Sequence, residues 1–106
     1  MIGYKLFTPE WTAVKGKGGT TNPYQYQVGQ SYEEPNEPKV GCTGFHFCKK
    51  LLDCFNYYGI EVHNRIALVE AYGTIDEGSN ACSTNKIRIV KEIPWKDAVD
   101  IIEKQM

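Results

Sequence analysis

Apolar and polar residues alternate in several short stretches of the chain, a period typical of half-buried β-strands. Residues 2–7 place three apolar side chains on one face. Residues 65–73 carry apolar side chains on both faces, which predicts a central strand covered on each side, with Glu70 as the exception. Further strands are predicted at residues 11–14, 24–28, 45–48 and 86–92.

Two stretches change to the helical period of three and four residues. Leu51, Leu52, Phe55 and Tyr58 predict a helix that begins just after Cys48, and Gly59 is placed to end it. A C-terminal helix follows Pro94, because Trp95, Ala98, Val99 and Ile102 repeat at positions i, i+3, i+4 and i+7.

Three segments predict loops. Residues 15–23 are rich in glycine and lysine, but the Gly-Lys-Ser/Thr order of a phosphate-binding loop is absent, so a hairpin tip is the stronger interpretation. Cys82 stands in a polar stretch over residues 81–85. Residues 33–38 combine two prolines with Glu33, Glu34 and Glu37, and this acidic loop is either a solvated connection or a contact for a basic partner.

These elements predict a single domain over residues 1–106. Its fold class is α+β, a mostly antiparallel sheet of five to six short strands packed against two helices.

The net charge of the chain argues against two functions, nonspecific nucleic-acid binding and mimicry of a nucleic acid. The formal net charge of −1 gives no basic face for nonspecific nucleic-acid binding and no large acidic surplus that would mimic a nucleic acid. No membrane is expected either, because no apolar segment approaches the ~20 residues that span a bilayer. The first residues lack the basic and apolar regions of a signal peptide, so a cytoplasmic location is expected.

The four cysteines are the main candidates for chemistry, and in a reducing compartment they are expected to be reduced or metal-bound. Zinc prefers four Cys or His ligands in a tetrahedron. We therefore predict a structural zinc on Cys42, Cys48, Cys54 and Cys82, with His46 as a substitute ligand. Cys54 is the weakest of the four, because a free cysteine inside an apolar helix is often a small core residue.

The spacing sets a condition on that site. Cys42 and Cys48 would lie ~20 Å apart on a straight strand, so both reach one ion only if Thr43 and Gly44 turn the chain back. A catalytic thiol is the less favoured alternative, because His46 and Cys48 are two residues apart and lie side by side rather than facing each other.

A short resemblance concerns residues 44–58, Gly-Phe-His-Phe-Cys followed by a helix that ends in Tyr. This stretch resembles the strand and helix that line the nicotinamide pocket of ADP-ribosyltransferases. The sequence departs from that family in lacking its first-strand His-Gly or Arg motif and its Gln-x-Glu segment. The resemblance leaves Glu70 as the carboxylate that could act in catalysis.

A longer resemblance covers nearly the whole chain. The motifs that carry it are Tyr4-Lys-Leu-Phe…Trp11, Tyr24-Gln-Tyr-Gln-Val-Gly29, Gly44-Phe-His-Phe-Cys48, Val69-Glu-Ala-Tyr-Gly73 and Lys86-Ile-Arg-Ile-Val-Lys-Glu-Ile-Pro-Trp95. In this order they resemble a small α+β domain found in phages and prophages of Gram-positive bacteria. Stand-alone phage proteins of this size include inhibitors of bacterial defence, among them anti-CRISPR proteins that bind Cas9.

The resemblance implies a zinc-binding protein that works in the cytoplasm of a bacterial host and inhibits a defence effector by binding it, with Cas9 as the specific partner. On this hypothesis Glu33, Glu34 and Glu37 contact the partner. The alternative is a divergent ADP-ribosyltransferase-like enzyme that modifies a host protein.

Overall fold

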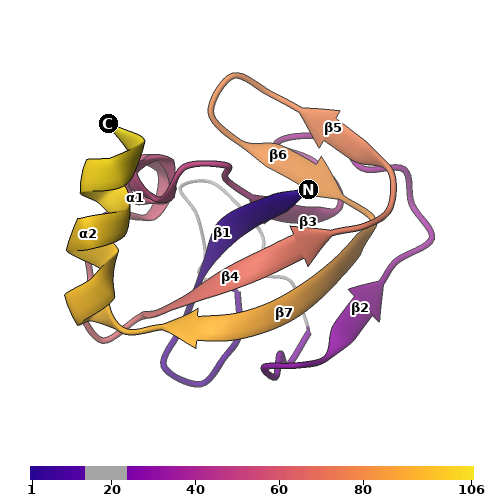
Figure 1. Ribbon diagram of the computed structural model, residues 1–106. Coiled ribbons are helices and arrows are strands. Elements are labelled where there is room, and N and C mark those ends of the chain that lie inside the picture. Colours follow the sequence, from indigo (N-terminus) through magenta and orange to yellow (C-terminus); the bar gives the residue numbers. More distant parts are fainter. Residues whose placement is uncertain (14–23) are drawn as a thin grey trace.

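The computed structural model describes residues 1–13 and 24–106. A four-stranded antiparallel sheet, here called the large sheet, has the strand order β1-β4-β7-β2 (Figure 1). A three-stranded antiparallel sheet, the small sheet, has the order β3-β6-β5. The bounds are β1 (Ile2–Phe7), β2 (Ser31–Glu33), β3 (Phe45–Phe47), α1 (Leu51–Tyr58), β4 (Arg65–Ala71), β5 (Ile75–Glu77), β6 (Cys82–Thr84), β7 (Lys86–Ile93) and α2 (Trp95–Gln105).

The predicted α+β class is confirmed, with two antiparallel sheets in place of one. The strand at 2–7, the central strand that begins at Arg65 and the strand that begins at Lys86 form where the alternation predicts them. Both helices also form as predicted, and Gly59 ends α1 with a φ of 72°. Among the described residues no helix is long and apolar enough to cross a membrane.

One apolar core lies between the inner faces of the two sheets. Phe45 and Phe47 of the small sheet are buried against Val69, Ile87 and other residues of the large sheet. The Tyr26 ring closes the side of this core, with edge contacts to Phe7 and Tyr32 at centroid distances of 5.0 and 4.9 Å.

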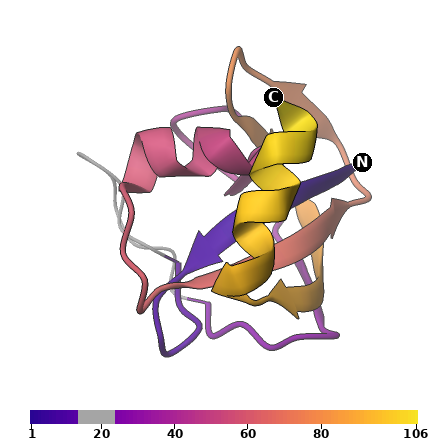
Figure 2. The same ribbon diagram turned by 60° about the vertical axis from the view of Figure 1, so that its left-hand side comes forward.

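A second apolar core lies on the outer face of the large sheet. Leu6, Ile66 and Ile93 of that sheet pack with Leu51 of α1 and Ala98 of α2. Figure 2 shows α2 crossing in front of the strands, with α1 beside it. The Trp95 indole fixes the start of α2, because its Nε1 donates a hydrogen bond to the Asn64 carbonyl over 2.7 Å.

Several sequence predictions are wrong. Residues 24–28 form no strand, because Tyr26 is held by ring packing and by one backbone bond to the Trp11 carbonyl rather than by a sheet. The short strand Ser31–Glu33, β2, was not predicted, and it ends at the first residue of the acidic loop, whose residues 34–38 are irregular as predicted. The predicted strand at 11–14 is reduced in its described part to a single bridge between Phe7 and Ala13.

Other predictions have mixed outcomes. Cys82 lies in β6 and is buried, not in a polar loop. The hairpin tip predicted at residues 15–23 lies outside the described residues.

Candidate functional site

The turn before β3 forms as the zinc prediction required, but Cys42 does not fold back against Cys48. Gly44 has a φ of 95°, and a Cβ on it would lie 2.9 Å from the Thr84 carbonyl oxygen. Cys42 lies on the outside of this turn and is exposed, whereas Cys48 is 3% exposed at the end of β3.

The other two cysteines lie on different layers. Cys54 is on α1 and belongs to the same core as Cys48, the one between the large sheet and the helices. Cys82 stands opposite Phe47 on the neighbouring strand and belongs to the core between the two sheets. The pleat of β3 therefore separates Cys82 from the Cys48 side chain.

Among the described residues no group of three or more His, Cys, Asp or Glu side chains is placed to hold a metal ion. The Nε2 atom of His46 accepts a hydrogen bond from the Gly41 N–H over 2.9 Å, so it is already engaged in a contact within the protein. Zinc binding therefore stays a prediction. Native mass spectrometry before and after a chelator tests it directly, because one bound zinc ion changes the mass of the folded protein.

A lysine that the sequence reasoning missed lies beside the thiol pair. Lys5 is on the inner face of β1 and is only 6% exposed. Its ammonium Nζ donates a hydrogen bond to the His46 carbonyl over 2.7 Å and lies 5.9 Å from the centre of the Phe7 ring. Burial lowers the pKa of Lys5 to about 8, against the opposing effect of the sulfur atoms of Cys54 and Cys48.

The pKa values of the two buried thiols are shifted in opposite directions. The neighbouring Cys54 lowers the pKa of Cys48 against the opposing effect of burial, and the Lys5 ammonium adds a smaller lowering effect. The neighbouring Cys48 and burial raise the pKa of Cys54, whose Sγ donates a hydrogen bond to the Tyr4 carbonyl over 3.5 Å. We call these three buried residues the Lys–thiol site: the Lys5 side chain points to the inner face of β1, whereas Cys48 and Cys54 belong to the core on its outer face.

Burial also affects the neighbouring histidine. It lowers the pKa of His46, and the Lys5 ammonium acts in the same direction. A neutral His46 ring is consistent with its role as a hydrogen-bond acceptor for the Gly41 N–H. The ring thus holds the turn that precedes β3, and the carbonyl of the same residue holds Lys5.

A second candidate site is the part of the large sheet that the helices leave uncovered. Ile2, Glu70, Arg88 and Ser31 stand opposite one another in a row across all four strands. Ile2 is 51% exposed, Arg88 and Ser31 are exposed, and Glu70 is half-buried. The Glu70 carboxylate lies 4.0 Å from Arg88 Nη1. In Figure 1 this end of the sheet lies opposite the helices.

The next row continues the exposed surface toward β2. Tyr72 is 45% exposed, and its hydroxyl donates a 3.4 Å hydrogen bond to Oε1 of Glu33. We call these two rows, represented by Ile2, Glu33, Glu70, Tyr72 and Arg88, the open face. The open face includes Tyr72 and Arg88, and tyrosine and arginine are among the residue types enriched where proteins bind one another.

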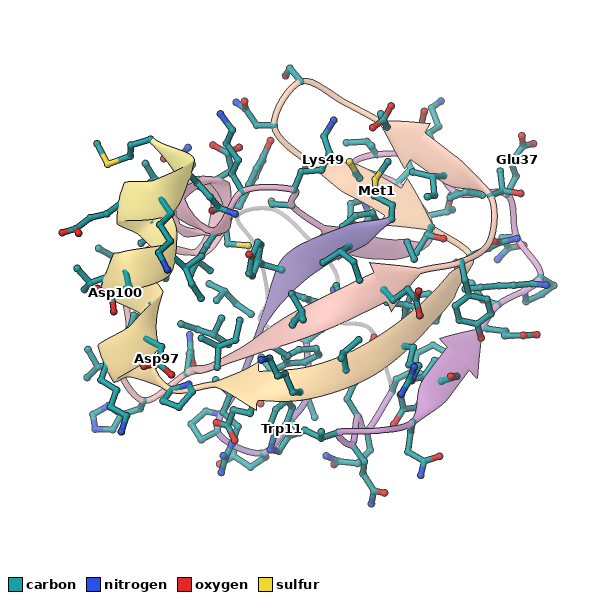
Figure 3. The ribbon with its side chains drawn as sticks, viewed as in Figure 1. Met1, Trp11, Glu37, Lys49, Asp97 and Asp100 are labelled. Atoms are coloured by element: carbon teal, nitrogen blue, oxygen red, sulfur yellow. The ribbon has the colours of Figure 1, made fainter. Side chains whose placement is uncertain are left out.

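The predicted partner-binding glutamates lie at the edge of this face. Glu33 is the last residue of β2, the outer strand of the large sheet in the described part of the chain, and it is exposed. Glu37 is exposed in the following loop, and Figure 3 places it at the opposite end of the molecule from Asp97 and Asp100 of α2. Glu34 is half-buried, and its N–H is bonded to the Asn85 carbonyl over 2.9 Å.

A shallow hollow of about 260 Å³ separates the open face from α2. Its lining includes the apolar side chains of Leu68 and Ile101, the Tyr4 ring and the charged residues Lys91 and Asp97. The hollow extends the open face toward the helices, because Leu68 and Glu70 point to the same side of β4.

The residues that resemble the ADP-ribosyltransferase pocket do not lie beside Glu70. Phe45 and Phe47 of β3 pack against the inner face of the large sheet, whereas Glu70 points outward next to Arg88. The large sheet therefore stands between the predicted nicotinamide-binding strand and the predicted catalytic carboxylate.

Comparison with known families adds one assignment. A family model described as a domain of unknown function (DUF7666) matches residues 1–101. The chain belongs to this family. No curated protein and no solved structure matches the chain. The DUF7666 match covers both candidate sites, the Lys–thiol site and the open face.

Proposed function

We propose that this DUF7666 domain acts by binding another protein through the open face and the acidic residues beside it. The observation that carries the proposal is the position of Glu33 and Glu37, which are exposed at the outer edge of a sheet face that also exposes Ile2 and Tyr72. When a partner docks on such a surface, the apolar side chains are buried by the contact and the neighbouring charges orient the partner.

The charge pattern favours a basic partner surface. The negative charge of these glutamates is confined to one part of the surface, because the whole chain has a formal net charge of only −1. The hydrogen bond from Tyr72 to Glu33 orients one carboxylate before a partner arrives. A preoriented carboxylate loses less side-chain entropy on binding, so the contact contributes more to affinity.

The specific form of the proposal is inhibition of a bacterial defence effector, with a Cas9-type nuclease as the partner. Its support is the resemblance to phage and prophage domains together with charge complementarity. Effectors of this kind hold nucleic acid in a positively charged channel, which an acidic protein edge can contact.

The test measures binding to a purified guide-loaded Cas9-type nuclease and inhibition of its DNA cleavage. The Glu33→Lys/Glu37→Lys variant reverses both exposed glutamates, and the Asp100→Lys/Glu103→Lys variant makes the same charge change on α2. We expect the first variant to bind at least about tenfold more weakly and the second to bind like the wild type. Equal binding by both variants, or no binding by the wild type, would contradict this form of the proposal.

The enzymatic alternative is tested with labelled NAD and a bacterial lysate. ADP-ribosyl transfer that the Glu70→Gln variant loses would support a divergent transferase over a binding protein. Because Glu70 also belongs to the open face, the same variant is measured in the binding assay. This comparison separates a lost reaction from a lost contact.

A further inference from the structure

Helices α1 and α2 share a row of apolar side chains that is partly exposed. Phe55 of α1 and Trp95 of α2 join the two helices, with ring centroids 5.6 Å apart. The row continues on α1 with Leu52, which is 45% exposed, and on α2 with Val99, which is 59% exposed. Ile102 lies about one turn beyond Val99 and is half-buried. We call these five residues the helix seam.

The packing of α2 on the large sheet does not use Val99. Ala98 is the residue of α2 that is buried in the core over that sheet, and Ile101 lines the hollow on one flank of the helix. Val99 is turned ~100° further round the helix than Ala98, so it projects beside the contact with the sheet. Figure 2 shows α2 in front of the strands. The seam is therefore a surface of the helix layer that a second molecule can cover.

Two opposite charges lie beside Val99. Lys96 comes three residues before it and Glu103 four residues after it, and both side chains are exposed. They lie on the same side of Val99, turned ~60° and ~40° from it, whereas Asp100 is turned ~100° away. Neither Lys96 nor Glu103 takes part in the ion pairs found among the described residues. The seam is thus flanked by a positive charge at one end and a negative charge at the other.

This order of charges is complementary to itself. An interface about a two-fold axis uses the same patch on both copies, so each charge on it needs its opposite at the position related by the axis. When two α2 helices lie antiparallel, the positive end of one seam meets the negative end of the other. A parallel pairing would instead bring Lys96 to Lys96 and Glu103 to Glu103.

We propose that a second copy of this chain docks on the helix seam, with the two α2 helices antiparallel about a two-fold axis beside Val99. Lys96 of each copy then lies opposite Glu103 of the other, which gives two ion pairs. The axis passes midway between positions 96 and 103, so the two Val99 side chains meet there. Leu52 and Phe55 extend the apolar contact onto α1.

The contact is small and leaves the acidic edge free. Helix α2 has 11 residues and is therefore ~16 Å long, so a reversible dimer is expected rather than a permanent one. Figure 3 places Glu37 at the opposite end of the molecule from Asp100 of α2. Dimer formation through α2 and partner binding through the open face are therefore separate properties.

The first test is sedimentation equilibrium of the whole chain at concentrations from about 10 µM to about 1 mM. Dithiothreitol is present throughout, because exposed Cys42 could otherwise cross-link two copies. We expect a dimer fraction that grows with concentration in the wild type and is lost in Val99→Asp, which brings two carboxylates together at the axis. Circular dichroism checks the fold of the variant, and exposed Val99 lies outside both cores.

Charge reversal tests the orientation of the helices. Lys96→Glu and Glu103→Lys each place like charges opposite one another twice, so each variant should associate at least about tenfold more weakly. The double variant Lys96→Glu/Glu103→Lys restores opposite charges and the original net charge, and it should associate like the wild type. Lys104→Glu is the matched control, since it makes the same change as Lys96→Glu at a position turned ~140° from Val99.

Three results would overturn the proposal. The first is a wild-type protein that stays monomeric at about 1 mM. The second is a dimer that Val99→Asp leaves intact, because the contact would then lie on another surface. The third is weak association of the single charge variants without recovery in the double variant, because Lys96 and Glu103 would then not face each other across the axis.

Discussion

The buried charge of Lys5 makes a quantitative prediction about stability and pH. The pKa of Lys5 is about 8 in the folded protein and 10.5 as its ordinary value. Between these two pH values the unfolded chain binds more protons than the folded one, so the free energy of unfolding rises with pH through this window. Below pH 8 the folded protein carries the full penalty of a buried ammonium.

The size of the effect follows from the linkage relation at about 1.4 kcal/mol per pKa unit. The penalty is about 3 kcal/mol at pH 7 and falls to about 1.4 kcal/mol at pH 9.5. No discount for solvent screening applies, because the side chain is buried. Relative to Lys5→Met, which keeps the length of the side chain without its charge, the wild type should therefore gain about 2 kcal/mol between these pH values.

The assay is urea unfolding of both proteins at a series of pH values from 7 to 9.5, in the presence of a reductant that keeps all thiols free. Subtracting the two curves removes the titration of shared groups whose pKa values Lys5 does not influence. A difference that stays constant with pH would refute the reasoning, because it would mean that Lys5 titrates equally in the folded and unfolded chains. A difference of the opposite sign would mean that the fold stabilises the ammonium.

The remaining predictions concern stability and are checked by urea unfolding. Gly44→Ala should destabilise the domain by about 3 kcal/mol, because Gly44 has a φ of 95° and its new Cβ would lie 2.9 Å from the Thr84 carbonyl oxygen. Gly41→Ala is its matched control: φ is 82° but no atom lies within 4 Å of the new Cβ, so a loss of about 1 kcal/mol is expected. Equal losses would contradict the steric part of this argument. Trp95→Phe should cost about 1 kcal/mol, because it removes the hydrogen bond to the Asn64 carbonyl; a neutral result would show that this bond does not stabilise the start of α2.

The longer helices and strands could be predicted from the sequence, because each buries one face and its apolar residues therefore repeat with a regular spacing. Strand β7 buries Ile87 and Ile89 and exposes Arg88, and its alternation is readable without the structure. Strand β2 was missed because three residues between a turn and a proline give no period to read. The alternation at residues 24–28 led to a wrong prediction of a strand, because Tyr24 and Tyr26 pack in an aromatic cluster without joining a sheet.

The candidate sites were less predictable than the fold. The cysteines stood out by residue type, but only the three-dimensional arrangement shows that Cys48 and Cys54 share one core while Cys82 lies in the other. In the alternating pattern of β1, Lys5 lies on the face opposite Tyr4 and Leu6, and such a face is normally exposed to water. The small sheet covers that face, and no local pattern in residues 2–7 signals it. Glu33 and Glu37 were found from composition alone, and both prove to be exposed.

The central claim is that the acidic edge beside the open face binds a basic protein surface. Its most direct measurement is the Kd for guide-loaded Cas9-type nuclease at low and high salt, for the wild type and for Glu33→Lys/Glu37→Lys. We predict that wild-type affinity falls with salt and that the variant binds more weakly at low salt and loses most of this salt dependence. Identical affinities and salt dependences in the two proteins would contradict the claim.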